Sequence, residues 1–188
     1  MSKKIIGNYQ LLEKIAEGGF GETYKAEHIV TKKLSCIKYA INLDPDDEKI
    51  LIEEARAMWE LRHYGIPSIR DLIRMPDSKL GLVMSYIEGL TLAQIIETHY
   101  PNGMEPEHVA WITDRVLNVL KYLHMHGIVH GDIKPQNIVV QPESHTIVLL
   151  DYGLSLFKPK ANTVAKGYTP YFCAPEQEGF EKGLLPET

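Results

Sequence analysis

Short hydrophobic runs separated by polar turns dominate the first 87 residues of this chain. The runs lie at residues 9–12, 23–24, 35–41, 66–73 and 80–86. Runs of this length that are rich in β-branched and aromatic residues are typical of strands. The pattern therefore predicts five short strands, and Pro, Asp and Ser at 76–78 predict a turn between the last two.

One helical pattern interrupts these strands. Asp44 suits the N-cap position, Pro45 suits the first helical position, and the acidic residues at 46–48 suit the first turn. One face at helical spacing then carries Ile50, Glu54, Met58 and Leu61. A helix is therefore predicted after residue 44, with Glu54 as the charged residue on an otherwise apolar face.

The position of Glu54 predicts an ion pair. A carboxylate on a core-facing surface needs a partner, because burying an unpaired charge is costly. The run 35–41 contains one lysine, Lys38, between apolar and small residues. Taken alone, Lys38 could equally face solvent from an edge strand, but Glu54 favours a Lys38–Glu54 pair. The neighbouring Glu53 lies about 100° further round the helix and is expected in solvent.

The second half of the chain is predicted to be mostly helical. Residues 92–99 form a short helix entered through Thr91, and residues 107–126 form a long one. The buried face of the long helix is expected to carry Val109, Ile112, Val116, Val119 or Leu120, and Leu123. Two short strands at 137–140 and 147–150 carry polar loops at their ends.

Composition and charge limit the expected classes of partner and the expected cellular compartment. The formal net charge is −5 and the basic residues are scattered, so neither a nucleic acid nor a membrane is an expected partner. No apolar run approaches twenty residues and the N-terminus lacks the apolar core of a signal peptide, so a cytoplasmic protein is expected. The two cysteines do not make a disulfide framework, and Cys36 is expected to be a small apolar filler. His130 is expected to be a packed structural imidazole.

Candidate chemistry lies around the two short strands. Residues 130–144 read HGDIKPQNIVVQPES, and LLDYGLS follows from residue 149. Asp132 stands two residues before Lys134 and five before Asn137, and Asp151 follows Asn137 by fourteen. Phosphoryl transfer to a hydroxyl uses such groups: a carboxylate orients the hydroxyl, a cation balances phosphate charge, and an amide oxygen and a second carboxylate hold Mg²⁺.

A glycine-rich segment precedes this region. Residues 15–26, IAEGGFGETYKA, place Gly18, Gly19 and Gly21 between two strand-like runs. Glycines let a hairpin bend closely over phosphates and direct its N–H groups at them. Glycine-rich hairpins are also common as purely structural turns, so this segment gains meaning only from the motifs that follow it.

With these motifs in this order, the chain resembles the Ser/Thr protein kinase family, in particular its bacterial members. The resemblance implies an α+β, bilobal protein-kinase-like fold, in which a five-stranded antiparallel N-lobe sheet with one helix is followed by an incomplete, mostly helical C-lobe. The implied domains are 1–87, which includes the hinge, and 88–188, which includes the catalytic loop and the activation segment. The implied activity is transfer of the γ-phosphate of ATP, with Mg²⁺ or Mn²⁺, to hydroxyls of a protein substrate.

The resemblance also assigns catalytic roles. Asp132 corresponds to the catalytic base, and Asn137 and Asp151 correspond to the metal ligands. Lys134 corresponds to the residue that supports the transferring phosphate, and its place two residues after the aspartate favours Ser/Thr over Tyr specificity. Thr169, in the run GYTPYFCAPE that ends the activation segment, would bond Asp132 and Lys134.

The remaining assigned positions concern the nucleotide. Lys38 would contact the α- and β-phosphates, Glu54 would fix Lys38, and Met84 corresponds to the gatekeeper. The glycine-rich loop, the hinge and the adenine-binding positions comprise Ile15, Ala16, Glu17, Gly18, Gly19, Phe20, Gly21, Glu22, Thr23, Ser85, Tyr86, Ile87, Cys36 and Val139.

Three positions depart from the family pattern. Ala16 replaces the first loop glycine, Gly131 replaces an arginine and Tyr152 replaces a phenylalanine. In relatives with arginine at the second of these positions, its guanidinium receives a phosphate from the activation loop. Phosphorylation of Thr163, the expected loop site, is therefore predicted to be unnecessary here.

The last part of the pattern leaves partner and function partly open. Twelve residues follow Glu176, whereas the family's C-lobe continues through several more helices. We therefore expect the helix at 107–126 to leave apolar surface that a homodimer or a partner chain covers. Two other functions stay open: a kinase-fold scaffold that binds nucleotide but transfers little phosphate, and a phosphotransferase that acts on a small molecule. Thr169-Pro170 and the A-P-E run argue against the small molecule, because they build a platform for a polypeptide.

Overall fold

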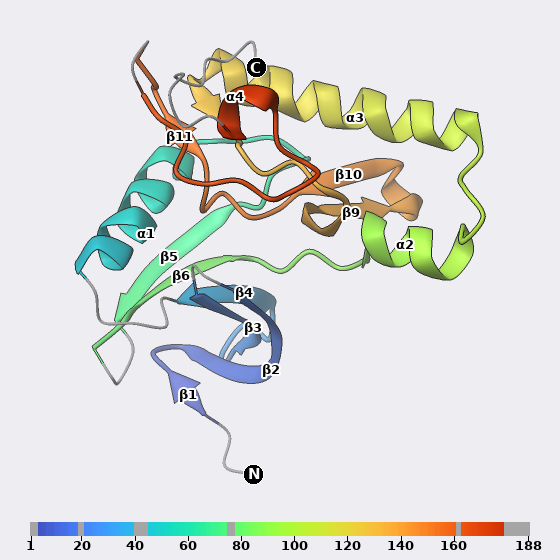
Figure 1. Cartoon of the computed structure of the whole chain (residues 1–188). Helices are drawn as coiled ribbons and strands as arrows, with labels where there is room; N and C mark the ends of the chain where they lie inside the picture. Colours follow the sequence, from blue (N-terminus) through green and yellow to red (C-terminus); the bar gives the residue numbers. More distant parts are fainter. Residues whose placement is uncertain (1–3, 19–20, 40–44, 75–77, 161–162, 179–188) are drawn as a thin grey trace. The chain divides into compact units, whose positions relative to one another are not determined.

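The computed structural model describes residues 4–18, 21–39, 45–74, 78–160 and 163–178. The chain divides into two compact units (Figure 1). Unit 1 comprises Met1–Arg62 and Pro67–Ile87, and unit 2 comprises His63–Ile66 and Glu88–Thr188.

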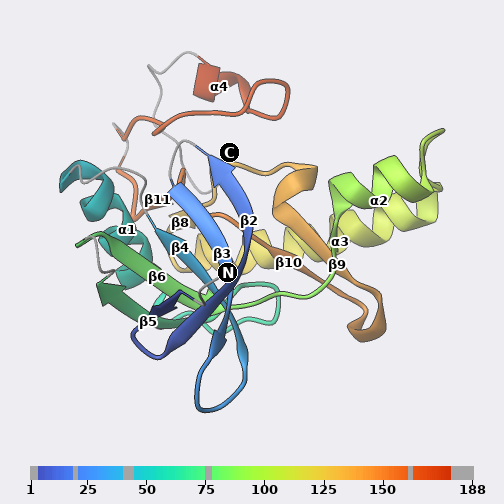
Figure 2. The ribbon, with the colours of Figure 1, turned by 90° about the horizontal axis from the view of Figure 1, so that it is seen from below.

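Unit 1 is built on an antiparallel sheet of six strands in the order β1-β2-β3-β4-β6-β5. In Figure 2 the strands β2, β3 and β4 run side by side. The bounds are β1 (Ile5–Ile6), β2 (Tyr9–Gly18), β3 (Gly21–His28), β4 (Leu34–Tyr39), β5 (Ile69–Arg74) and β6 (Leu80–Ser85). The sequence predicted five strands; the sixth is β1, which forms because Ile5 and Ile6 pair with the start of β2.

The start of the fourth predicted strand also differs. The pattern placed it at residue 66, whereas β5 begins at Ile69. The reason is that His63–Ile66 belongs to unit 2, where the Gly65 carbonyl accepts a hydrogen bond from Leu149 N at 2.9 Å. A Cβ on Gly65 would lie 2.3 Å from Val119 Cγ2, so only glycine fits this contact without a shift.

Apolar residues cover both faces of the unit 1 sheet. One cluster comprises Ile6, Tyr9, Leu11, Ala26, Ile37, Tyr39 and Val83. Helix α1 (Pro45–Met58) contacts β5 and β6, and Leu51 and Ala55 of α1 pack with Leu80 and Leu82 of β6. Because side chains alternate along a strand, Lys38 points away from the face that holds Ile37 and Tyr39. The predicted N-cap Asp44 lies outside the described residues.

Unit 2 combines helices with two small sheets. The helices are α2 (Leu92–His99), α3 (Pro106–Met125) and α4 (Pro175–Glu178), with 3₁₀ turns η1 (Pro135–Asn137) and η2 (Pro142–Ser144). One sheet has the order β10-β9-β7 and the other pairs β11 with β8. Their bounds are β7 (Leu90–Thr91), β8 (Ile128–Val129), β9 (Ile138–Gln141), β10 (Thr146–Leu149) and β11 (Leu156–Phe157). Helix α2 has its predicted bounds, and Thr91 closes a capping box with Gln94.

The predicted buried face of α3 is only partly right. Val119 and Leu123 are fully buried, because the contacts of α3 within unit 2 are with β8 and β10. Val109, in the first turn, is 47% exposed, so its predicted burial was wrong. In the part of the chain that the structure describes, no helix is both long enough and apolar enough to cross a membrane.

Candidate active site

The predicted pair of Lys38 and Glu54 is present in unit 1. Strand β4 carries Lys38 and helix α1 carries Glu54, and Lys38 Nζ lies 3.2 Å from Glu54 Oε2. The two side chains are 10% and 4% exposed. Removing one partner of such a buried pair leaves an uncompensated charge, at a cost of about 3–5 kcal/mol. The pair therefore fixes the Lys38 ammonium group beside Glu54 of α1.

The glycine-rich hairpin is described at its two arms. Gly18 of β2 pairs with Gly21 of β3, and Ala16 pairs with Thr23. Of the loop positions assigned to the nucleotide, Gly19 and Phe20 lie outside the described residues. Ile15, on the β2 arm of the hairpin, is 48% exposed.

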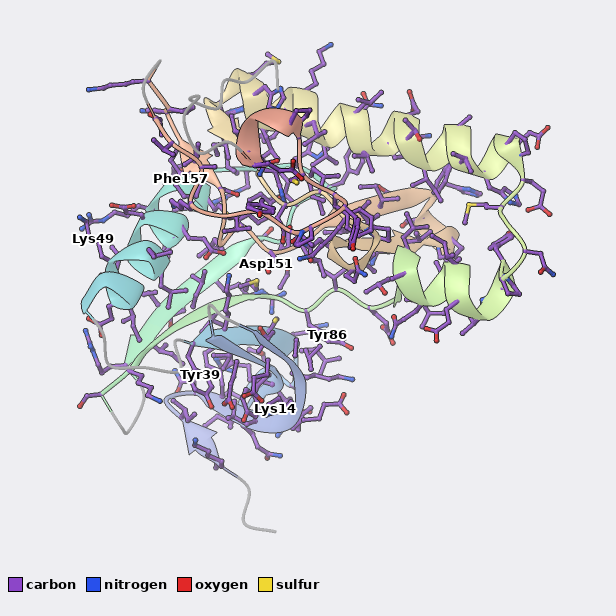
Figure 3. The ribbon with its side chains drawn as sticks, in the orientation of Figure 1. Lys14, Tyr39, Lys49, Tyr86, Asp151 and Phe157 are labelled. Atoms are coloured by element: carbon purple, nitrogen blue, oxygen red, sulfur yellow. The ribbon has the colours of Figure 1, made fainter. Side chains whose placement is uncertain are left out.

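Glu22 joins this hairpin to β4. Its Oε2 accepts hydrogen bonds from Tyr39 Oη at 2.6 Å and from Tyr24 Oη at 3.1 Å. The bond from Tyr39 holds the pKa of the Glu22 carboxyl below its usual range, and burial raises the pKa of the Tyr39 phenol. Lys14, which also bonds Glu17 at 2.5 Å, lies 3.5 Å from Glu22 Oε1 (Figure 3 labels Lys14 and Tyr39). The hairpin is thus tied to the strand that carries Lys38.

In unit 1 the assigned adenine-side positions lie on β4, on β6 and just after β6, whereas Val139 lies on β9 of unit 2. Cys36 pairs with Met84 across the two strands, and burial raises the pKa of the Cys36 thiol to about 12, which fits the predicted unreactive filler. Ser85 N donates to Ser68 O at 2.9 Å, and Ser68 N donates back to Ser85 Oγ at 3.0 Å. Tyr86, labelled in Figure 3, lies under the Lys25 ammonium, whose nitrogen is 4.7 Å from the ring centroid. Ile87, which follows it, is half-buried.

In unit 2 the Asp132 carboxylate is the centre of a group of four side chains. Its Oδ1 accepts a hydrogen bond from Thr169 Oγ1 at 2.6 Å, and its Oδ2 accepts one from Asn137 Nδ2 at 2.9 Å. Lys134 Nζ lies 2.8 Å from Oδ2 and donates to Thr169 Oγ1 at 2.9 Å. The contacts predicted for Thr169 are therefore confirmed. The arrangement places a buried carboxyl group beside the Lys134 amine and the Thr169 hydroxyl.

His130 sets the backbone on both sides of this group. Its Nδ1 accepts from Asp132 N at 3.2 Å, so the ring proton sits on Nε2 and is donated to Leu150 O at 3.1 Å. Burial lowers the pKa of His130 to about 4, against a smaller raising effect of the bond to Leu150. The imidazole is 1% exposed, as predicted for a packed structural histidine. It therefore connects the Asp132 backbone to the residue before Asp151.

The two assigned metal ligands have suitable atoms. Asn137 uses its Nδ2 to donate to Asp132 O and to Asp132 Oδ2, both at 2.9 Å, which leaves its Oδ1 as the atom for a cation. Leu150 N donates to Asn137 O at 2.7 Å, so the backbone of Asn137 lies beside the segment that leads into Asp151. Asp151, labelled in Figure 3, is exposed and has a φ of 60°. One amide oxygen and one carboxylate suit Mg²⁺, which keeps waters and phosphate oxygens as its other ligands.

Two of the departures from the family pattern have structural consequences. Gly131 has a φ of 79°, and a Cβ there would lie 2.8 Å from Leu154 O, so the arginine usual at this position would not fit this backbone without a shift. Tyr152 is buried, its hydroxyl donates to Leu149 O at 3.3 Å, and its ring contacts His130 with a centroid distance of 4.8 Å. The tyrosine thus keeps the packing of a phenylalanine and adds a satisfied hydroxyl.

Comparison with known proteins decides the family. The model of the protein kinase domain matches residues 9–179 of the chain. The chain belongs to this family. The kinase domain is also similar to a probable serine/threonine-protein kinase of Dictyostelium discoideum, with 33% identity over 81% of this chain and 33% of the relative.

Two bacterial proteins are similar over most of the kinase domain. Serine/threonine-protein kinase D of Synechocystis is 29% identical over 94% of this chain and 37% of its own length. Serine/threonine-protein kinase pkn3 of Myxococcus xanthus is 28% identical over 94% of this chain and 34% of its own length. The chain thus spans about a third of the length of the curated relatives it matches.

Sequence reasoning missed two side chains at the site of unit 2. Ser155 is fully buried and its Oγ donates to His130 O at 2.9 Å. Gln177 is 7% exposed and its Nε2 donates to Gly131 O at 2.9 Å. Neither residue stands in a spacing that indicates chemistry, although Gln177 directly follows the A-P-E run.

Proposed function

We propose that this kinase domain is an ATP-dependent Ser/Thr protein kinase, which transfers the γ-phosphate of ATP to hydroxyls of a protein. The observation that carries the proposal is the Asp132 carboxylate with Lys134 and Thr169 bonded to it. A positioned carboxylate can orient a substrate hydroxyl and accept its proton, and an adjacent ammonium can balance charge on the phosphate.

The geometry supports separate roles for the two oxygens of Asp132. Thr169 Oγ1 holds Oδ1, while Asn137 and Lys134 hold Oδ2, so the carboxylate cannot rotate freely. A substrate hydroxyl that displaces one of these contacts would meet a carboxylate with a fixed direction, which is the positioning that phosphoryl transfer requires.

For the nucleotide, we propose that Lys38 pairs with phosphate oxygens and that Glu54 fixes its position. The support is the buried 3.2 Å pair, which places the ammonium before any ligand binds. The other positions proposed to contact ATP are the loop residues 15–23, the gatekeeper Met84, the hinge residues Ser85, Tyr86 and Ile87, and the adenine-side residues Cys36 and Val139.

For the metal, we propose that Asn137 Oδ1 and the Asp151 carboxylate would hold Mg²⁺ or Mn²⁺. Among the described residues, no three Asp, Glu, His or Cys side chains gather into a metal site, so the remaining ligands would be water and phosphate oxygens. Bound Mg²⁺ would supply positive charge at the phosphates.

We further propose a protein substrate and a cytoplasmic location. The names of the three relatives indicate protein substrates phosphorylated on Ser or Thr. Lys134, bonded to Thr169, is the residue whose place after Asp132 favours Ser/Thr over Tyr. The support for a cytoplasmic location is the proposed use of ATP.

A transfer assay with radiolabelled ATP and a generic protein substrate tests the proposal. We expect label on Ser or Thr with the wild type, and a loss of at least a hundredfold in Asp132→Ala, because no group would remain to orient the hydroxyl. Label transfer that is unchanged in Asp132→Ala would contradict the assignment of the base.

A second measurement tests the metal residues without turnover. Mg-ATP should raise the melting temperature of the wild type, and this shift should vanish in Asp151→Ala, because Mg²⁺ would lose its carboxylate ligand and the triphosphate would lose the positive charge of the metal. Asp151→Ala with an unchanged shift would remove Asp151 from the proposed site.

A further inference from the structure

The peptide group that joins Gly131 to Asp132 is held at both of its hydrogen-bonding ends. Its carbonyl oxygen, on Gly131, accepts from Gln177 Nε2 at 2.9 Å. Its N–H, on Asp132, donates to His130 Nδ1 at 3.2 Å. A peptide group is planar and rigid, so two bonds on its opposite edges fix the rotation of the plane and the direction in which the chain enters Asp132.

Gln177 is itself fixed. Its Oε1 accepts a hydrogen bond from Ala174 N at 3.0 Å. This bond fixes which end of the side-chain amide is the oxygen and which is the donating nitrogen. With the oxygen turned to Ala174, the nitrogen faces Gly131 O. The side chain is 7% exposed, and α4 places it through a single short turn, Pro175–Glu178.

The loop has little freedom to compensate for the loss of this bond. At a φ of 79°, Gly131 leaves only 2.8 Å between an ideal Cβ and Leu154 O, so the backbone is closely packed on one side. The carbonyl of the preceding residue, His130, is occupied by Ser155 Oγ. The bond from Gln177 thus adds a contact from α4 to a loop whose preceding carbonyl is already bonded.

We infer that Gln177 is a positioning residue for phosphate transfer. Through its bond to Gly131 O, Gln177 fixes the 131–132 peptide and thereby the direction of the Asp132 carboxylate. This control lasts only while α4 keeps Gln177 in place. Thr169, earlier in the same segment, bonds the carboxylate of Asp132, so the segment controls Asp132 at its side chain and at its peptide. This inference rests on the proposed function.

Gln177→Glu is the sharpest variant. It keeps the length of the side chain and an oxygen for Ala174 N, but it turns a carboxylate oxygen toward Gly131 O. We expect kcat to fall about tenfold to a hundredfold, since a misplacement of about 1 Å can cost a hundredfold. The KM for ATP should stay within about twofold, because Gln177 touches no proposed nucleotide contact. Gln177→Met loses both hydrogen bonds of the amide but places no carboxylate against Gly131 O, so its kcat should lie between those of the wild type and Gln177→Glu.

Gln141→Glu is the matched control. Gln141 Nε2 also donates to a backbone carbonyl of unit 2, that of Glu88, at 3.1 Å, but at an exposed position. We expect Gln141→Glu to keep the wild-type kcat. A kcat for Gln177→Glu within twofold of wild type, or a KM for ATP that rises as much as kcat falls, would overturn the inference.

Amide exchange separates this inference from the proposed function. In the nucleotide-free chain, hydrogen exchange at the Asp132 amide should become at least about tenfold faster in Gln177→Glu and stay unchanged in Gln141→Glu. This readout needs no phosphate transfer, so an inactive wild type would remove the proposed function, while the exchange rate would still decide whether Gln177 fixes the 131–132 peptide. Unchanged exchange at Asp132 in a folded Gln177→Glu overturns it. If Gln177→Glu does not fold, Gln177→Met replaces it under the same criteria.

Discussion

At the scale of single residues, the site of unit 2 depends on buried polar side chains that bond to other segments of the chain. His130, Asp132 and Ser155 are each under 10% exposed, and each bonds a group in another segment. Leaving such a group without a partner costs about 1–3 kcal/mol, so these bonds select one backbone arrangement. The neutral state of His130 is part of that arrangement, because its Nδ1 must accept.

The protonation of His130 should therefore appear in the stability of the protein. Its pKa is lowered by burial to about 4, from 6.5 in the unfolded chain, so the unfolded state binds the proton more readily. The contribution is fully present above about pH 6.5 and is lost as the pH falls toward about 4, at roughly 1.4 kcal/mol per unit of pKa difference and about 3 kcal/mol in all. Urea unfolding measured across this window checks the slope.

Two histidine variants serve as test and control. His130→Asn should flatten the fall in unfolding free energy below about pH 6.5, because the titrating group is gone. His126→Asn, at the exposed C-terminal end of α3, is the matched variant at an exposed histidine. A wild-type slope that survives in His130→Asn would contradict this assignment.

At the scale of elements, α3 shows that burial is decided by what lies opposite a side chain. Leu123 is fully buried against the strands of unit 2, whereas Leu117, on the same helix, is 58% exposed. Both are leucines in a helix interior, so helix propensity does not distinguish them.

The two leucines give a matched pair of stability variants. Leu123→Ala should lower the free energy of unfolding by about 2–5 kcal/mol, because it leaves a cavity in the core. In the monomer, at a concentration too low for self-association, Leu117→Ala should change it by less than about 0.5 kcal/mol. Denaturant unfolding of both variants decides the point, and equal losses would show that the exposed face of α3 also packs in solution.

The segment 163–178 carries the prediction about phosphorylation. Thr163 Oγ1 accepts from Lys160 N at 2.7 Å, which is a local turn contact, and Gly131 has no side chain to receive a phosphate. Thr163→Ala should therefore keep most of the transfer rate. The measurement is the initial rate of label transfer to a protein substrate. A loss of a hundredfold or more would mean that another cation, such as Lys158, Lys160 or Lys166, has taken the place of the missing arginine.

At the scale of the whole molecule, the groups proposed for phosphate transfer belong to two units that each have their own core. Unit 1 supplies Lys38 and Glu54, and unit 2 supplies Asp132, Asn137 and Asp151. Each set is ordered by contacts within its own unit.

The exposed apolar side chains of α3 predict self-association of the 188-residue chain. Val109 is 47% and Leu117 is 58% exposed, with half-buried Val116 and Leu120 beside them on the helix. Covering apolar area gains about 25 cal/mol per Å², which favours a dimer or larger species at micromolar concentration. Light scattering should show this for the wild type and a smaller effect for Leu117→Lys. A monomer at that concentration would contradict the prediction.

Several features could be predicted because they depend on local spacing. The hydrophobic runs within residues 9–86 predicted strands, the family resemblance implied that these strands form an antiparallel sheet, and Thr91 predicted the cap of α2. The single charge on the apolar face of α1 predicted the Lys38–Glu54 pair. The order of Asp132, Lys134, Asn137 and Asp151 predicted a kinase, and the family match confirms that membership. The roles of these residues stay predictions.

Other features were decided only by tertiary structure. Strand β1 exists because Ile5 and Ile6 meet the start of β2, and Val109 is exposed because α3 meets β8 and β10 further along. Gln177 reaches Gly131 across 46 positions of sequence. Periodicity reports which face of an element is apolar, and the order of motifs reports which chemistry is present. Neither reports which distant backbone group a buried amide will find, because that partner is chosen by how the segments pack and by the cost of leaving a buried hydrogen-bonding group unpaired.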